Sequence, residues 1–367
     1  MKQAVLITTH YWNSKRKAGF HWIADSLARS GWDVLFFTAP ISWLSALRND
    51  YRMEYPVRKE AGKIVAFENN IKSFVWFTPW HPANLRLGLL NKISHNFFRK
   101  YAEFPLGESE EYIKQANLIV IECGPALLLV NRLKKLNPDA RIVYRVSDDL
   151  RLLHNHPLVI ESEEEAAPKF DLVSVPSNFI YKRFEGLKNL RLQYHGIRKD
   201  LYDENRPSPY DDIKGTNFVF VGQAHFDIDF LMRASEMSPD WHFHIIGPIK
   251  DIPKRDNIHT YGEMPFRDTV PYIKHANIGL HTLAYSFGAE SFTDSLKVIQ
   301  FTYCSLPIVA PEFLKGNREH AFYYRPGDDN SIREAINNAL NCNRSQIIND
   351  DILSWDEITP SLTGEQD

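Results

Sequence analysis

Short apolar runs alternate with longer amphipathic stretches along the first half of the chain. The runs are typical of buried strands, and the stretches between them carry apolar residues at helical spacing. Strands are expected at Val5–Thr8, Val34–Phe37, Ile64–Phe67, Ser73–Phe77, Leu118–Glu122, Ile142–Val146 and Leu172–Val175. Helices are expected at Gly19–Ser30, Leu85–Glu103, Ser109–Gln115, Pro125–Leu136 and Ile160–Ala167. Strands that alternate with helices form βαβ units, so this pattern predicts a mainly parallel sheet.

The alternation stops between Tyr194 and Gly215, where prolines and short polar residues prevent either period from continuing. It then restarts, with strands expected at Phe218–Gly222, Phe243–Gly247, Ile278–His281 and Ile308–Ala310, and helices at Val270–His275, Ser291–Cys304 and Ser331–Leu340. A chain of 367 residues also exceeds the size at which one core stops growing. We therefore predict an α/β protein with two Rossmann-like domains, residues 1–197 and 216–345, joined by a linker, 198–215. The segment 346–367 is expected to return to the first domain through Trp355.

Two such sheets that face each other create a cleft, because open α/β sheets bind ligands beyond the carboxyl ends of their strands. Composition excludes several other classes of protein. A net charge of −3 gives no global attraction for nucleic acid. The three cysteines, Cys123, Cys304 and Cys342, have neither metal-site nor disulfide spacing, so a reducing cytoplasm is expected. No apolar run reaches the length of a signal peptide or membrane span, and the glycine fingerprint of dinucleotide oxidoreductases is absent.

The stretch from Thr293 to Ala310 reads as a helix that begins at a polar cap, carries Lys297 in its first turns and ends before a short buried strand. The start of such a helix offers free N–H groups and a positive dipole end to an anion, and the lysine adds a full charge. The pattern indicates a phosphate site, although an ordinary α/β helix fits it as well.

Four separate stretches together resemble one family. They are residues 120–124, residues 142–150, the pair 261–264 and 272–276, and the helix start with Asp294, Ser295, Lys297 and Gln300. In order and spacing, from about Thr8 to Trp355, the chain is similar to the GumK-type glucuronosyltransferases of xanthan assembly, glycosyltransferase family 70.

The resemblance implies a GT-B fold and an inverting transfer that needs neither a metal nor a cofactor. It also implies a UDP-glucuronate donor and an acceptor oligosaccharide on a polyprenyl diphosphate. The enzyme would then act in the cytoplasm, on the inner face of the plasma membrane.

Asp148 follows the expected strand Ile142–Val146, and the resemblance makes it the catalytic base. Inverting transfer needs a carboxylate that removes the proton of the attacking hydroxyl. The alternative is that Asp148 caps the helix after it. Asp149 stands where the family has a glycine, and two adjacent carboxylates can raise one pKa, so the role of Asp149 stays open.

The resemblance places the donor in the second domain, where Lys297 would neutralise the departing diphosphate. A solvated helix lysine is the alternative. The further donor-binding candidates are Ser295, Gln300, Gly222, Gly262, Glu263, Met264 and Tyr285. Tyr285 is a substitute for a family tyrosine without a clear match here, and a hexose other than glucuronate remains an alternative donor.

The acceptor-binding candidates are Glu122, His10 and Trp12, at the ends of the first and fifth expected strands. Glu122 can equally pair with Arg145 on the neighbouring strand. The basic residues after Trp12, Lys15, Arg16 and Lys17, fit either a charged contact to the acceptor or a solvated loop.

The segment from Leu85 to Phe104 is basic and aromatic, and at helical spacing it gives an apolar stripe bordered by cations. Such helices lie in the headgroup region of anionic bilayers. The membrane-contact candidates are Arg86, Lys92, Phe97, Phe98, Arg99 and Lys100. Packing of the stripe on the protein's own sheet is the alternative.

Three other functions fit the same pattern. They are transfer of another hexose from a UDP-sugar, a nucleotide-sugar epimerase or hydrolase of GT-B fold, and a non-catalytic nucleotide-sugar binding protein.

Overall fold

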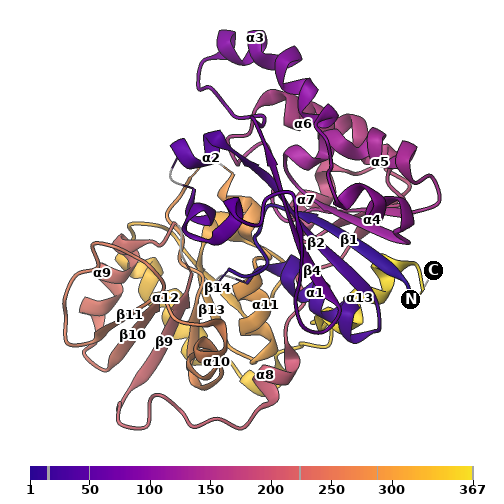
Figure 1. The fold of residues 1–367 in the computed structure, drawn as a ribbon. Coiled ribbons are helices and arrows are strands. Elements are labelled where there is room, and N and C mark those ends of the chain that lie inside the picture. Colours follow the sequence, from indigo (N-terminus) through magenta and orange to yellow (C-terminus); the bar gives the residue numbers. More distant parts are fainter. Residues whose placement is uncertain (15–16, 49, 223–224, 287, 366–367) are drawn as a thin grey trace. The chain divides into compact units, whose positions relative to one another are not determined.

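A computed structural model describes residues 1–14, 17–48, 50–222, 225–286 and 288–365 (Figure 1). Lys15, Arg16 and the other positions between these ranges lie outside the described residues. The chain forms two compact units. The first comprises Met1–Gln193 with Trp355–Asp367, and the second comprises Tyr194–Ser354.

The first unit is built on an eight-stranded sheet in the order β3-β4-β2-β1-β5-β6-β7-β8. All neighbours in it are parallel except β3, which is antiparallel to β4. The strands are β1 (Gln3–Thr8), β2 (Asp33–Ser42), β3 (Ile64–Ala66), β4 (Ile71–Thr78), β5 (Leu118–Glu122), β6 (Arg141–Arg145), β7 (Leu172–Val175) and β8 (Leu190–Leu192). The mainly parallel sheet is confirmed, and the sequence missed only β8, which is short and half-buried.

The helices of this unit are α1 (Gly19–Arg29), α2 (Trp43–Leu47), α3 (Gly88–Arg99), α4 (Ser109–Gln115), α5 (Val130–Leu136), α6 (Pro157–Ala166), α7 (Asn178–Arg183) and α13 (Trp355–Thr363). The helix expected from Ile160 begins earlier, at Pro157. His156 precedes it and its Nδ1 accepts the N–H of Leu158 at 3.1 Å, and proline fits the first helical position. Before α5, residues Pro125–Leu129 form a 3₁₀ turn.

The C-terminal helix α13 packs on α1 of the first unit (Figure 1). Trp355 is buried, and a β-carbon on Gly19 would come within 2.9 Å of its ring, so a glycine permits this close approach. At the surface, Arg29 pairs with Asp356 at 2.7 Å.

The second unit has a six-stranded parallel sheet in the order β11-β10-β9-β12-β13-β14. Its strands are β9 (Thr216–Val221), β10 (Trp241–Ile246), β11 (Ile258–Gly262), β12 (Ile278–Leu280), β13 (Ile308–Pro311) and β14 (Ala321–Tyr324). Its helices are α8 (Lys199–Asp203), α9 (Ile228–Met237), α10 (Phe266–His275), α11 (Leu296–Tyr303) and α12 (Asp329–Leu340). The segment 198–215, predicted as a linker, lies inside this unit, where Tyr202 and Tyr210 are buried in the same cluster as Val219.

Both sheets reverse their strand order once, between β1 and β5 in the first unit and between β9 and β12 in the second. Ligands of open α/β sheets bind beyond the carboxyl ends of the strands at such a reversal. The residues after β1, β5, β9 and β12 are therefore where function is expected. Among the described helices, none has the length and apolar character needed to cross a bilayer.

Candidate active site

Glu122 is the last residue of β5 and its carboxylate is buried, with 5% of the side chain exposed. It accepts hydrogen bonds from the Thr8 hydroxyl, from the Thr9 backbone N–H at 3.0 Å and from Ser147 Oγ at 2.7 Å. His10 Nε2 lies 3.5 Å from its Oε1. The carboxylate thus joins the ends of three adjacent strands, β1, β5 and β6.

Burial by itself would raise the pKa of Glu122, but the charge of His10 and the hydrogen bonds from His10, Thr8 and Ser147 outweigh it and lower this pKa to about 2. Burial lowers the pKa of His10, but the neighbouring Glu122 carboxylate stabilises the charged imidazole. The result is a pKa of His10 above its usual value. The alternative partner, Arg145, instead donates to Ser174 Oγ and to the Gln193 carbonyl. Glu122 is therefore a fixed negative charge.

Asp148 follows β6 and is half-buried beside this charge. Burial, and then the neighbouring Glu122 carboxylate, raise the pKa of Asp148 to about 6, although the His10 charge opposes the shift. The helix-cap alternative is wrong, because the next helix begins at Pro157 and is capped by His156. A carboxylate with a raised pKa is a stronger base than an exposed one and suits proton abstraction near neutral pH.

Asp149 points into a different environment. It is buried and forms ion pairs with Arg151 at 2.5 Å and with Arg183 at 3.1 Å, and Arg183 also binds the buried Glu163. Burial would raise the pKa of Asp149, but the hydrogen bonds and charges of the two arginines lower it. The neighbour that raises the pKa of Asp148 is therefore Glu122, and Asp149 holds the loop in place.

A pocket of about 390 Å³ in the first unit contains His10, Glu122 and Asp148 together. Trp12 does not line it. The indole lies 5.6 Å from the His21 ring and 5.2 Å from the Phe36 ring, and it borders a separate hollow beside Phe67. The sequence missed several polar lining residues, which come from segments after β2, β4 and β6: Arg48, Arg52, His81, Asn84, His154, Asn155 and His156.

In the second unit, Lys297 occupies the first turn of α11, two positions after the N-cap residue Ser295. Its Nζ lies 4.1 Å from the centroid of the Phe220 ring. Burial lowers the pKa of Lys297 to about 7, and no carboxylate offsets this effect among the described residues. Lys297 is only partly exposed and its Nζ lies against an aromatic ring, which disfavours the solvated-lysine alternative and leaves the ammonium able to take an anionic partner.

Three buried polar atoms of the second unit have no hydrogen-bond partner within the described ranges. They are His281 Nδ1 and Thr282 Oγ1, which follow β12, and Ser295 Oγ. Buried polar groups are almost always partnered in folded proteins, so these three atoms can still take a hydrogen-bond partner. The charge of Lys297 acts on His281, which places the ammonium near the same atoms.

Glycines end three neighbouring strands beside Lys297. A β-carbon on Gly247 would lie 1.8 Å from the Gly222 carbonyl oxygen, and one on Gly222 would lie 3.2 Å from Lys297 Nζ. Gly247 N–H donates to the carbonyl of Gly262 at 2.8 Å. Because these glycines carry no side chain, the backbone stays accessible at the carboxyl edge of β9, β10 and β11. A flat ring or a phosphate can approach it there.

The other donor candidates are spread around this edge. Glu263 is exposed, Met264 packs partly into the core cluster that contains Val298, and Gln300 is buried in α11. Tyr285 is exposed and stands edge-on to Phe313 at 5.3 Å.

The helix α3 carries its apolar side chains outward, where Leu89 is 70% and Ile93 68% exposed. Phe97 is exposed, but Phe98 is buried against His156, with ring centroids 5.0 Å apart. The alternative that this stripe packs on the sheet is wrong for Leu89 and Ile93, and the prediction of membrane contact is wrong for Phe98. The cations expected to border the stripe are all exposed: Arg86, Lys92, Arg99 and Lys100.

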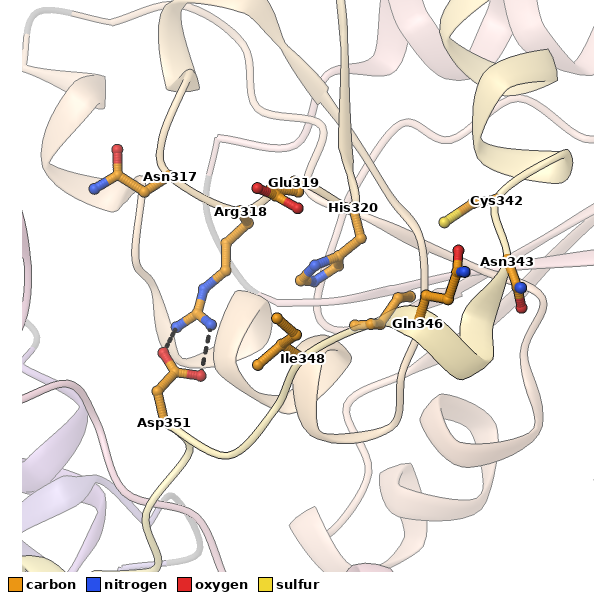
Figure 2. Close-up of a pocket in the computed structure, with 10 residues that line it drawn as sticks. Asn317, Arg318, Glu319, His320, Cys342, Asn343, Gln346, Ile348 and Asp351 are labelled. Atoms are coloured by element: carbon orange, nitrogen blue, oxygen red, sulfur yellow. Dashed lines mark hydrogen bonds and ion pairs between the residues drawn. The ribbon is translucent and has the colours of Figure 1, made fainter.

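A further pocket of about 420 Å³ lies wholly in the second unit, beside the segment that leads to the C-terminal helix (Figure 2). Arg318 projects into it and is paired with Asp351 at 2.8 Å. None of the predicted donor residues lines this pocket. Over the described ranges, no three His, Cys, Asp or Glu side chains are grouped so as to hold a metal ion.

Two Rossmann-like units, each with polar residues at the reversal of its strand order, are the architecture of the GT-B fold. Solved structures with this fold match the whole chain. Sucrose-phosphate synthase from Thermosynechococcus elongatus has a TM-score of 0.61 at 13% identity, covering 100% of this chain and 94% of its own. Anabaena HepE in complex with UDP-glucose has a TM-score of 0.60 at 12% identity, covering 100% and 98%.

The chain belongs to the GumK family of glucuronosyltransferases. The family model for the N-terminal domain of glucuronosyltransferase GumK matches residues 6–176. The UDP-glucuronate:glycolipid 2-beta-glucuronosyltransferase of Xanthomonas campestris pv. campestris is 30% identical over 358 residues, which are 97% of this chain and 88% of the relative. The protein is therefore an enzyme, a glycosyltransferase, as the sequence predicted.

Replacing Arg183 with methionine leaves the carboxylates of Asp149 and Glu163 buried without their shared cation. We expect the free energy of unfolding to fall by about 3–5 kcal/mol, because a broken buried ion pair leaves uncompensated charge. Denaturant unfolding followed by circular dichroism measures the change, with the exposed neighbour Lys182→Met as the control. Equal stability of the two variants would show that the network contributes nothing.

Proposed function

We propose that this enzyme transfers glucuronate from UDP-glucuronate to the glycan of a lipid-linked acceptor, with inversion and without a metal ion. The observation that carries the proposal is the 30% identity, over almost the whole chain, to a UDP-glucuronate:glycolipid 2-beta-glucuronosyltransferase. The acceptor is proposed to be an oligosaccharide on a polyprenyl diphosphate, used in assembly of an exopolysaccharide or capsule.

In the proposed step, a carboxylate oxygen of Asp148 takes the proton of an acceptor hydroxyl. The hydroxyl oxygen attacks the anomeric carbon from the side opposite UDP, and the bond from that carbon to the diphosphate oxygen breaks. Both new charges are then accounted for, since the proton stays on Asp148 and the electron pair leaves with UDP. The pocket supports this role because it places Asp148 beside the polar groups of His10 and Glu122.

The leaving diphosphate is proposed to bind at the start of α11. Lys297 supplies a positive charge there, and Ser295 Oγ and Thr282 Oγ1 are buried donors without a partner in the described part of the chain. Fixed donors at the site of developing charge stabilise a leaving group without reorganisation. Such a site needs no metal ion, since the cation it requires is a side chain.

Contact with the membrane surface is proposed for α3, which lies beside α6 (Figure 1). This helix is tied to the pocket, because the carbonyl of Asn91 and the hydroxyl of Ser94 both lie 3.1 Å from His156 Nε2, and His156 lines the pocket. Leu89 and Ile93 would enter the headgroup region, and a lipid-linked glycan would reach the pocket from that surface.

Substituting Asp148 with asparagine removes the proposed base but keeps the shape of the side chain. With UDP-glucuronate and a mannose-terminated lipid acceptor, we expect transfer to fall by about 10²–10⁴-fold while UDP affinity is unchanged. The parent enzyme should lose kcat/KM about tenfold per pH unit below about pH 6, because the pKa of Asp148 is about 6 and only its carboxylate is a base. Mass detection of the product measures both effects.

The same assay separates the competing functions. UDP-glucose in place of UDP-glucuronate tests the donor, and omission of the acceptor tests hydrolysis or epimerisation. Full activity of the Asp148→Asn enzyme would remove that residue from the mechanism. Turnover without acceptor, or faster transfer from UDP-glucose, would contradict the proposed reaction.

Replacing Lys297 with methionine should weaken UDP binding by at least about tenfold, the loss expected for one charge-assisted contact to phosphate. Burial lowers the pKa of this lysine to about 7, and the anion favours its charged form. UDP should therefore bind more weakly as the pH rises above about 7, and near pH 8 binding should take up close to one proton. Calorimetry in buffers of different ionisation enthalpy measures the uptake.

The control is Lys250→Met, at an exposed lysine of the same unit. It should keep both the affinity and the proton uptake of the parent. Identical proton uptake by the Lys297→Met protein would show that another group titrates.

The double substitution Leu89→Asp and Ile93→Asp should reduce binding to anionic phospholipid vesicles by about tenfold or more, because two exposed apolar side chains lose their favourable transfer from water. Co-sedimentation measures the bound fraction. Ile348→Asp, at a residue that is 71% exposed in the second unit, is the matched control. Unchanged binding of the double variant would rule out α3 as the contact.

A further inference from the structure

The pocket of the first unit has two walls of opposite charge. One wall follows β5 and β6 and carries the carboxylates of Glu122 and Asp148. The other follows β2 and β4 and carries Arg48, Arg52 and His81. Because the sheet order is β4-β2-β1-β5-β6, these walls stand at opposite sides of the pocket, with the residues after β1 between them. The second wall has no part in the proton transfer proposed above.

Arg48 is the uncompensated charge on that second wall. It ends α2, its side chain is exposed, and its guanidinium donates to the carbonyl of Asn84 at 3.2 Å. It forms no ion pair with a carboxylate in the described part of the chain. An arginine that is oriented by a carbonyl, and still has most of its donors unused, is suited to bind an oxyanion in a bidentate manner.

His81 and Arg52 complete a wall of donors. The Ser42 hydroxyl lies 2.7 Å from His81 Nδ1, and a hydrogen bond donated by the serine leaves the proton of the neutral ring on Nε2, which has no partner among the residues described. Burial, and then the charges of Arg52 and Arg48, lower the pKa of His81 to about 4, so the ring is neutral and close to both arginines. Arg52 is buried, pairs with Asp50 at 2.5 Å and donates to the Thr9 carbonyl at 2.7 Å.

We infer that Arg48, Arg52 and His81 form a subsite for a phosphoryl group carried by the lipid of the acceptor. Guanidinium groups only donate hydrogen bonds, so Arg48 and Arg52 favour an anion with several acceptor oxygens, and a phosphate is such an anion. The inference rests on the proposed function for the identity of the acceptor. It extends that function by assigning the residues that recognise the charged link between glycan and lipid.

The diphosphate of the donor does not fit this wall. The ends of β2 and β6 are separated by three inter-strand spacings, roughly 14 Å. The anomeric carbon must come within about 3–3.5 Å of the hydroxyl that Asp148 activates, and the departing phosphate is bonded to that carbon through one oxygen. A phosphoryl group on the Arg48 wall therefore belongs to the far end of the acceptor.

A phosphate carried by a lipid suits this wall better than free phosphate does, because exposed apolar side chains precede Arg48 on α2. Trp43 is 58% exposed and Leu47 80% exposed, both on the five-residue helix α2, and Arg48 is the C-cap residue that follows it. They offer an acyl or prenyl chain a contact next to the charge, whereas inorganic phosphate gains nothing from them.

The test measures binding alone, with the donor site saturated by UDP. Inorganic diphosphate and farnesyl diphosphate are titrated into the whole protein by calorimetry. We expect farnesyl diphosphate to bind more tightly than inorganic diphosphate, and Arg48→Gln to weaken both by about tenfold or more. Arg48→Lys should keep part of the affinity, and Lys135→Gln, which removes an exposed charge elsewhere on the same unit, should change nothing.

Equal affinity of the Arg48→Gln and Lys135→Gln proteins for both probes would overturn the subsite. Equal affinity of the parent for the two probes would overturn its assignment to a lipid, and would assign it to free phosphate. Circular dichroism checks that each variant is folded, and the exposure of Arg48 leads us to expect that it is. Because no transfer is measured, an inactive enzyme that still binds diphosphate through Arg48 would contradict only the proposed function.

Discussion

The buried carboxylate of Glu122 is the interaction on which the first unit's site depends. It sits at the reversal of strand order, where backbone and hydroxyl donors from β1 and β6 converge on it. A charge this deep is tolerated only because these donors and His10 surround it. In return it fixes three loops relative to one another and gives Asp148 a negative neighbour, which keeps that carboxyl group poised to take up a proton.

The candidate site of the second unit holds a cation, Lys297, where that of the first unit holds the carboxylate of Glu122. Lys297 lies over the Phe220 ring and has no anionic partner among the residues that the structure describes, so burial brings its pKa down to about 7. The resting site thus avoids a full unpaired charge and regains it when an anion arrives. Asp148 is a base above about pH 6, and Lys297 is charged below about pH 7, so both free groups are in their proposed working states only in a narrow range near neutrality.

The sequence predicted the strands that are apolar runs buried in the sheet, and it placed Asp148 after a strand and Lys297 at a helix start. It did not predict β8, β11 and β14, which are short or partly exposed and lack a continuous buried run. It did not predict Arg48, Arg52 and His81 as one group, because only the pairing of β2 with β4 brings those segments together. Phe98 was misplaced for a geometric reason. Adjacent helical residues point about 100° apart, so Phe97 faces outward while Phe98 packs on His156. Trp12, predicted to bind the acceptor, does not line the pocket because its indole packs against Phe36.

Most of the charged groups in the pocket of the first unit are compensated by a neighbour of opposite charge. Asp50 neutralises Arg52, and His10 neutralises Glu122, each within hydrogen-bonding or ion-pair distance. Two groups remain without an oppositely charged partner among the described residues, the carboxylate of Asp148 and the guanidinium of Arg48. They lie on opposite walls of a pocket that water can enter, so the attraction between the two charges is weak. A ligand with a hydroxyl at one end and an anion at the other would satisfy both groups at once, so the proposed subsite would fix the orientation of the acceptor as well as its identity.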